Sequence, residues 1–179
     1  MDADRLHVLT GAPGSGKTAI LEGLGDRVRT LEEPAREVIA EQRAIGGAGT
    51  TDQDPALFVA LLLERSIDKH RVALRSAGAL ALFDRGVPDC VAYAAVLGVD
   101  PTESLAAAER YRYNPRVMIL EPWKQIYATD AERTMSYEQT IPFHEALVEA
   151  YEGVGYTLVS VPTGSIEDRV AFVRDAIIR

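Results

Sequence analysis

The sequence predicts one α/β domain in which a parallel sheet is covered by helices on both faces. Short, nearly continuous apolar runs alternate with longer stretches of helical periodicity, which is the pattern of repeated β-α-β units. The chain has 179 residues, of which 47% are apolar and 26% charged, so it can form one sizeable core and has a globular composition. Ligands of such folds bind at the carboxyl ends of the strands.

The expected elements follow from apolar runs and turn residues taken in chain order. Pro34 and Pro55 suit the first turn of a helix, and Gly78 ends one. An apolar run that closes on an acid, as residues 79–84 do, is typical of a strand buried on both faces. We expect strands at 6–10, 27–32, 79–84, 116–121 and 156–161. We expect helices at 17–24, 35–44, 55–77, 88–97, 102–111, 142–152 and 166–178, and a polar loop or lid at about 122–137.

A complete phosphate-loop motif, G-x-x-x-x-G-K-[ST], lies between the first strand and the first helix. Glycines let the backbone amides of such a loop point inward at a helix N-terminus, where an anion is favoured. We expect Lys17 to reach the β- and γ-phosphates of a nucleoside triphosphate and Thr18 to ligate Mg²⁺ through its hydroxyl. The expected nucleotide-binding residues are Gly11, Ala12, Pro13, Gly14, Ser15, Gly16, Lys17 and Thr18.

Other interpretations of this stretch are weaker. A chance glycine-rich turn would not place eight motif residues in register between a strand and a helix. A dinucleotide fingerprint also fits, because Gly14, Gly16 and Ala19 match G-x-G-x-x-A and Glu32 and Glu33 follow about 20 residues later. That motif starts directly at a strand end, however, and gives no reason for an adjacent lysine and threonine. The sequence has neither N-K-x-D nor D-x-x-G, which disfavours a GTPase of the Ras type and points to ATP.

Charged residues follow the other predicted strands and indicate a second half of the site. Asp84 could hold Mg²⁺ or its water, accept the proton of an acceptor hydroxyl, or cap the next helix, and spacing does not separate these roles. Glu33 and Arg36 suit a polar or phosphorylated acceptor, although a surface ion pair explains them equally well. We also expect Arg85 and Asp89 on the acceptor side. Asp89 and Tyr93 are four residues apart on one helix face, and we expect both to line the acceptor pocket.

The expected lid carries Arg133, which could swing onto the transferring phosphoryl group as charge develops. A solvated loop arginine is the alternative. Residues 162–165, after the last strand, would border the adenine or simply form a helix-start turn.

Composition limits the partners. A net charge of −8 and a pI of about 4.9 disfavour nucleic acid or an anionic membrane as the main partner, since both need a basic surface. A single cysteine, Cys90, allows no disulfide framework, and the three histidines show no metal-ligand spacing. With no secretory signal and no apolar run of about 20 residues, we expect a cytoplasmic protein, monomeric or homodimeric.

The chain resembles the small AAA-type ATPase-like family of phosphate-loop proteins that is related to the ribosylnicotinamide kinase domain. The matching stretches are GAPGSGKT at 11–18, EEPAREVI at 32–39, FDRGVPDCVAY at 83–93, LEPW at 120–123 and YEGVGYTLVSVP at 151–162. The resemblance implies a nucleoside-kinase-like fold with strand order 2-3-1-4-5, ATP with Mg²⁺, a lid after the fourth strand, and phosphoryl transfer. By motif it gives Lys17 and Thr18 the loop roles and Asp84 that of the strand-three acid. It puts Glu33 and Arg36 on the acceptor side and makes Arg133 the lid arginine.

The sequence thus supports an ATP-dependent phosphotransferase that acts on a small hydroxylated, nucleoside-like metabolite. The alternative is a nucleotide-dependent ATPase, switch or binding module that has no small-molecule acceptor.

Overall fold

The structure, a computed structural model, describes residues 3–76, 78–127 and 135–178. The described residues form one sheet of five parallel strands in the order β2-β3-β1-β4-β5, so the predicted fold is confirmed. The strands are β1 (Leu6–Gly11), β2 (Arg29–Leu31), β3 (Ala81–Asp84), β4 (Arg116–Leu120) and β5 (Thr157–Ser160). The α-helices are α1 (Lys17–Leu24), α2 (Pro34–Ile45), α3 (Pro55–Arg75), α4 (Val87–Leu97), α5 (Thr102–Arg110), α6 (Tyr137–Gly153) and α7 (Ile166–Ile178). Two short 3-10 turns, η1 (Ala3–Arg5) and η2 (Gly25–Arg27), precede β1 and β2.

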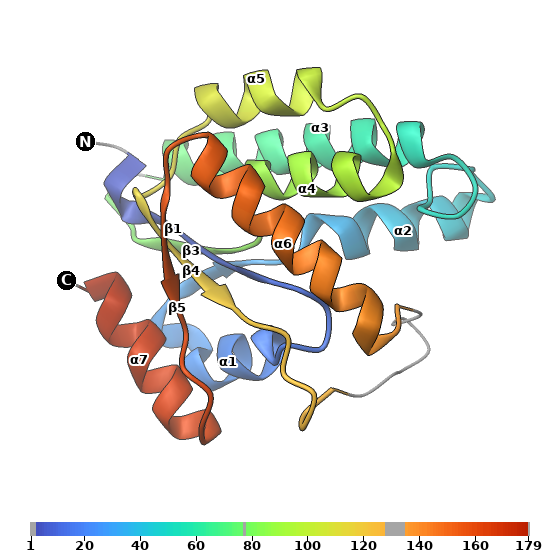
Figure 1. Cartoon of the computed structure of the whole chain (residues 1–179). Coiled ribbons are helices and arrows are strands. Elements are labelled where there is room, and N and C mark those ends of the chain that lie inside the picture. Colours follow the sequence, from blue (N-terminus) through green and yellow to red (C-terminus); the bar gives the residue numbers. More distant parts are fainter. Residues whose placement is uncertain (1–2, 77, 128–134, 179) are drawn as a thin grey trace.

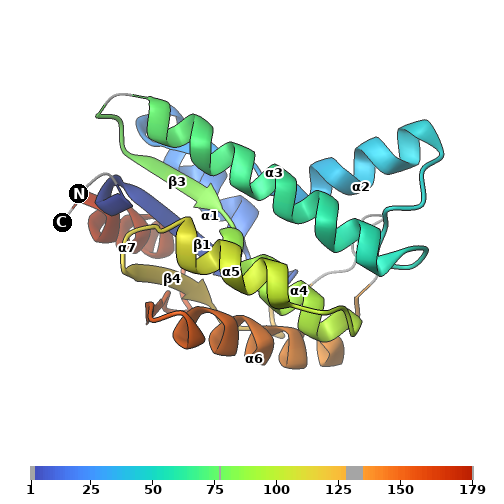
Figure 2. The same cartoon turned by 90° about the horizontal axis from the view of Figure 1, so that it is seen from above.

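Helices cover both faces of the sheet, which gives three layers (Figure 1). On one face α1 and α7 pack together; on the other α4 lies between α3 and α6, and α5 packs on its outer side (Figure 2). The side chains of β1 alternate between the two layers, so Leu6 and Val8 enter the larger core while Leu9 enters the smaller one. Side chains of β1 therefore pack in both cores, and the phosphate loop follows at the end of this strand.

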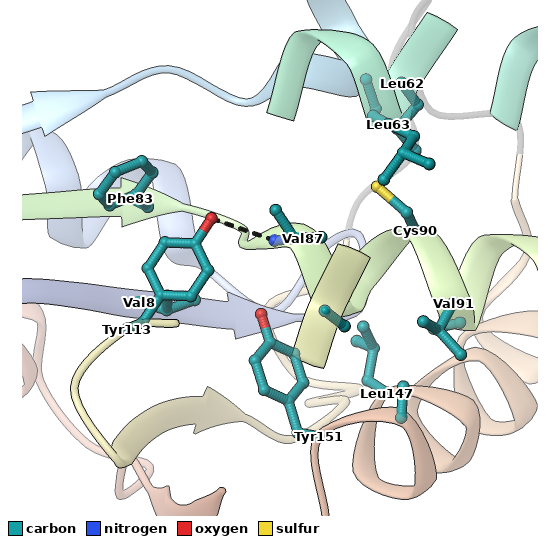
Figure 3. Packing of buried hydrophobic residues seen from close by; sticks show 14 of the residues in the cluster. Val8, Leu62, Leu63, Phe83, Val87, Cys90, Val91, Tyr113, Leu147 and Tyr151 are labelled. Atoms are coloured by element: carbon teal, nitrogen blue, oxygen red, sulfur yellow. Dashed lines mark hydrogen bonds between the residues drawn. The ribbon is translucent and has the colours of Figure 1, made fainter. Parts of the chain in front are cut away.

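The larger core fixes the start of α4 next to the site (Figure 3). The ring of Tyr113 packs against Phe83 with centroids 5.0 Å apart, and its hydroxyl accepts a hydrogen bond from the backbone N–H of Val87 at 3.2 Å. Tyr151 and Leu147, both fully buried, hold α6 against the same helix. This packing sets where the residues between β3 and α4 lie.

The clearest difference from the sequence prediction is the start of α6, expected at Pro142 and found at Tyr137. The Ser136 hydroxyl accepts from the backbone N–H of Gln139, and the Gln139 side chain accepts from the N–H of Ser136. This reciprocal capping box starts the helix one and a half turns before the proline, which lies inside it. The second strand is also shorter than predicted, because η2 occupies its expected first residue.

The carboxyl ends of the strands share one edge of the sheet, where β1 runs into the phosphate loop and β3 ends at Asp84. Glu33 follows β2 at the same edge. Glu33 and Asp84, which the sequence singled out, therefore lie at the same edge as the end of β1, as parallel topology requires. Among the described helices, none combines the length and apolar character needed to cross a membrane.

Candidate functional site

The phosphate-loop motif follows β1 and leads into α1. Gly14 and Gly16 have φ angles of 77° and 90°, which residues with side chains rarely adopt, so the loop curls back on itself. Gly11 lies so close to β4 that a Cβ atom there would be 2.6 Å from the carbonyl oxygen of Leu120. The helix therefore opens on a tight glycine loop at its N-terminus, an arrangement that binds phosphate in proteins.

Lys17, the last but one residue of the motif, is the first residue of α1 and is buried. Its Nζ donates to the carbonyl oxygen of Gly11 at 3.1 Å. Burial, and after it the positive charge of Arg85, lowers the pKa of Lys17, although nearby carboxylates oppose the shift. A phosphate group in the loop would give the ammonium a counter-charge and would be held by it.

Thr18 and Asp84 line a side hollow of about 390 Å³ next to the loop. Asp84 is buried, and its Oδ1 accepts no hydrogen bond in the described part of the chain. Burial raises the pKa of this carboxyl group, while Lys17 acts to lower it. A buried carboxylate oxygen that accepts no hydrogen bond is available to bind a cation. Among the described residues no three His, Cys, Asp or Glu side chains are grouped to hold a metal, so a Mg²⁺ ion would also need phosphate oxygens.

Arg85 is the centre of a buried charge cluster between β3 and α4. Its φ angle is 76°, unusual for a residue other than glycine, and only 2% of its surface is exposed. Its Nε donates to Glu33 Oε1 at 2.7 Å, and one terminal nitrogen donates to Asp89 Oδ1 at 2.9 Å. The guanidinium also lies over the rings of Tyr93 and Phe143, 5.8 and 5.5 Å from their centroids. The strained backbone is thus stabilised by two ion pairs and two aromatic contacts.

Asp89 lies behind Arg85. It does not line the cavity of about 580 Å³ next to the phosphate loop, although the sequence predicted that it would line the acceptor pocket. Besides Arg85, its carboxylate accepts from Thr10 Oγ1 at 2.7 Å, Gly86 N at 2.9 Å and Tyr151 Oη at 2.5 Å. These donors come from β1, the start of α4 and α6. Together with Arg85, these donors occupy both oxygens of the Asp89 carboxylate. Asp89 therefore holds Arg85 in position and has no free lone pair aimed at the cavity.

Glu33 lies between two arginines and lines the same cavity. Its Oε1 accepts from Arg85, and its Oε2 lies 3.1 Å from Nε of the half-exposed Arg36. Burial alone would raise the pKa of Glu33, but Arg85, Lys17 and Arg36 together lower it to about 2. Arg36 also donates to the Thr18 hydroxyl at 3.5 Å, so it connects the loop to the acid.

The cavity of about 580 Å³ joins these groups. Lys17 and the loop glycines line it together with Glu33, Arg36 and Arg85, so the predicted donor and acceptor residues share one space. The remaining lining is mostly apolar or aromatic, and it comprises Ala35, Ile39, Tyr93, Trp123, Ile126, Met135 and Ile166 among others. The volume lies in the range of small-molecule sites in proteins, about 300–1,000 Å³.

Arg169 of α7, which the sequence did not indicate as a site residue, also lines this cavity and is 4% exposed. It donates to the carbonyl oxygen of Ser15 at 2.9 Å and lies over the Trp123 ring, 5.4 Å from its centroid. No local signal marks it, because an arginine in an amphipathic helix is usually a surface residue. Arg133, the arginine of the predicted lid, lies outside the described residues; the adjoining 122–127 and 135–136 are loop.

A family model described as an AAA domain matches residues 6–169. Among solved structures the chain is similar to NadR protein in complex with NR, with 16% identity, a TM-score of 0.72, and coverage of 98% of this chain and 50% of that one. The chain thus spans half the length of that protein. No curated protein sequence gave a match.

Two further solved structures cover nearly the whole chain. Thymidylate kinase from Ehrlichia chaffeensis matches with 14% identity and a TM-score of 0.59, over 96% of this chain and 98% of that one. Deoxyadenosine kinase from M. mycoides with bound dATP matches with 13% identity and a TM-score of 0.54, over 97% and 100%. At such identities the likeness concerns the fold alone.

Proposed function

The chain belongs to the AAA_28 family of AAA domains, and from this premise we propose that it transfers the γ-phosphoryl group of ATP to a small hydroxylated metabolite. Nucleoside-like compounds are the first acceptors to test. The similar structures named above are those of small-molecule kinases or of a protein bound to NR, which supports this choice without fixing the acceptor.

The observation that carries the proposal is the shared cavity. A simple ATPase needs a phosphate loop and a path for water. Here the space next to the loop is lined by Glu33 and Arg85 as well as Lys17, and also by the side chains of Ile39 and Tyr93. A hydroxylated organic molecule fits such a lining, because polar groups at one end orient it while its apolar part is buried. The loop would then hold the donor within reach of an acceptor hydroxyl.

The charged residues divide into two roles. Lys17 and the loop amides would bind the β- and γ-phosphates and offset the charge that develops during transfer. Asp84 lines the hollow beside Thr18 and not the main cavity, which favours the metal-holding role over that of base. Mg²⁺ held by Thr18, Asp84 and the nucleotide would neutralise phosphate charge. Glu33, kept ionised by its arginines, would accept a hydrogen bond from the acceptor hydroxyl and orient it.

A weak base is sufficient for this chemistry. Phosphoryl transfer passes through a loose transition state, so alignment of the hydroxyl matters more than early removal of its proton. Arg36 lies between the Thr18 hydroxyl and Glu33, where it would contact the phosphoryl group as it moves from donor to acceptor.

The test is a coupled assay of ADP formation from Mg-ATP against a panel of nucleosides and other hydroxylated metabolites. We expect one class of acceptor to raise the rate at least tenfold over the acceptor-free rate. Lys17→Ala should abolish this activity, whereas Asp84→Asn should reduce turnover while leaving nucleotide binding largely intact. An exposed change, Arg174→Gln, serves as a matched control. Equal rates with and without every acceptor would favour the ATPase or switch.

A further inference from the structure

Arg169 is a buried cation for which the described chain provides little compensation. One terminal nitrogen donates to the carbonyl oxygen of Ser15, but Nε is buried without a hydrogen-bond partner. Among the described residues no carboxylate lies within 4.0 Å of the guanidinium, while Trp123 gives it only a ring contact. Arg174 on the same helix is 42% exposed and pairs with Asp175. The helix thus carries one ordinary surface arginine and one buried arginine that has no acidic partner in the described part of the chain.

Such an arrangement costs stability unless a ligand completes it. A buried charge without a partner is expensive, and a buried N–H without an acceptor adds to that cost. Burial lowers the pKa of Arg169, which reflects the same lack of compensating charge. A purely structural contact to the Ser15 carbonyl could have been made by a neutral donor. The charge therefore requires another explanation.

The position of the guanidinium indicates which kind of ligand would pair with its charge. A Cβ atom on Gly16 would be 2.6 Å from one of its terminal nitrogens, so the guanidinium lies directly against the phosphate loop. It lines the cavity together with Gly14, Lys17 and Gly164. The lining is rich in cations beside the loop, which favours a polyanionic ligand there.

Topology separates this arginine from the acceptor side. In the order β2-β3-β1-β4-β5, Glu33 follows β2, whereas Arg169 follows β5, so they approach the loop of β1 from opposite sides. If the γ-phosphate points towards the Glu33 side for transfer, the α- and β-phosphates lie towards β5.

We propose that Arg169 is a nucleotide-binding residue by which α7 contacts the α- and β-phosphates of the donor. It would complete the phosphate loop from the C-terminal side, with its guanidinium as a charge-assisted donor. This inference rests on the nucleotide-binding part of the proposed function and not on the identity of the acceptor. Because these phosphates are common to ADP and ATP, Arg169 should contribute equally to the affinity for both.

The test compares Arg169→Met, Arg169→Lys and the control Arg174→Gln by calorimetric titration with Mg-ADP and Mg-ATP. We expect Arg169→Met to weaken both nucleotides by a similar factor of about 10–100, the range for lost charge-assisted hydrogen bonds. Arg169→Lys should recover part of the loss, and Arg174→Gln should bind like the wild type. Without nucleotide, the melting temperature of Arg169→Met should equal or exceed that of the wild type, because methionine removes an uncompensated buried charge.

Several outcomes would overturn the proposal. Unchanged affinities in Arg169→Met, with a lower melting temperature, would show that Arg169 only clamps the loop carbonyl. A loss for ATP alone would contradict the assignment to the α- and β-phosphates. If wild-type protein binds neither nucleotide, the proposed function fails together with this inference, whereas unchanged binding in the variant leaves the proposed function standing.

Discussion

The ion pairs of Glu33 predict how the stability of the fold depends on pH. The carboxyl group has a pKa of about 2 in the folded chain and an ordinary value of 4.5. Because the folded pKa is the lower one, the stabilisation is fully present above about pH 5 and is lost as pH falls towards 2. A difference of this size corresponds to about 3 kcal/mol at neutral pH, of which about 2 kcal/mol is lost by about pH 3. Since Glu33 is buried, solvent screens this interaction little.

The assay is urea unfolding of the wild type and Glu33→Gln at a series of pH values from about 7 to 3. The variant cannot titrate at this position, so the gap in unfolding free energy between the two proteins should narrow by about 2 kcal/mol on acidification. Glu109→Gln, an exposed change on α5, controls for general loss of acidic charge. A gap that stays constant over this pH range would refute the claim that the arginines hold Glu33 ionised.

Three further predictions concern the surroundings of the site. Asp89→Asn should lower the unfolding free energy by about 3–5 kcal/mol, because it leaves a buried cation with one acid fewer; a loss below about 1 kcal/mol in urea titration would contradict this. Gly11→Ala should cost more than about 2 kcal/mol, since its Cβ would meet the backbone of β4, whereas Gly153→Ala, where the space is open, should be near neutral in the same titration. Burial raises the pKa of Cys90 to about 12, so iodoacetamide at pH 8 should label it only after unfolding, and rapid labelling of the native protein, measured by mass spectrometry, would disprove the burial.

The layers and the phosphate loop could be predicted because each rests on a local or repeated pattern, whereas the strand order followed only from the resemblance to a known family. The β1–α1 junction is encoded by eight consecutive residues, and the parallel sheet by apolar runs between helices. The start of α6 was misplaced because Pro142 looks like a first-turn proline. The capping pair Ser136 and Gln139 was the better signal, since it satisfies backbone groups at the true helix start.

The roles of Asp89 and Arg169 could not be predicted, because they depend on which side chains meet in the folded chain. A helix spacing of four places Asp89 and Tyr93 on one face but does not say whether that face meets a cavity or Tyr151. In the same way, the pattern of α7 does not show that Arg169 reaches Ser15 on the loop, 154 residues away in sequence. Burial and pairing of charges follow from tertiary packing, which periodicity does not specify.

In the proposed function, the phosphate loop and Glu33 with its two arginines form two halves of one transfer site. The most direct measurement follows the label from ATP labelled in the γ-phosphate, in the presence of the acceptor that most raises turnover. We expect the label to appear in the organic acceptor in step with ADP, and Lys17→Ala to abolish both products. Label found only in inorganic phosphate, at a rate independent of any acceptor, would contradict it.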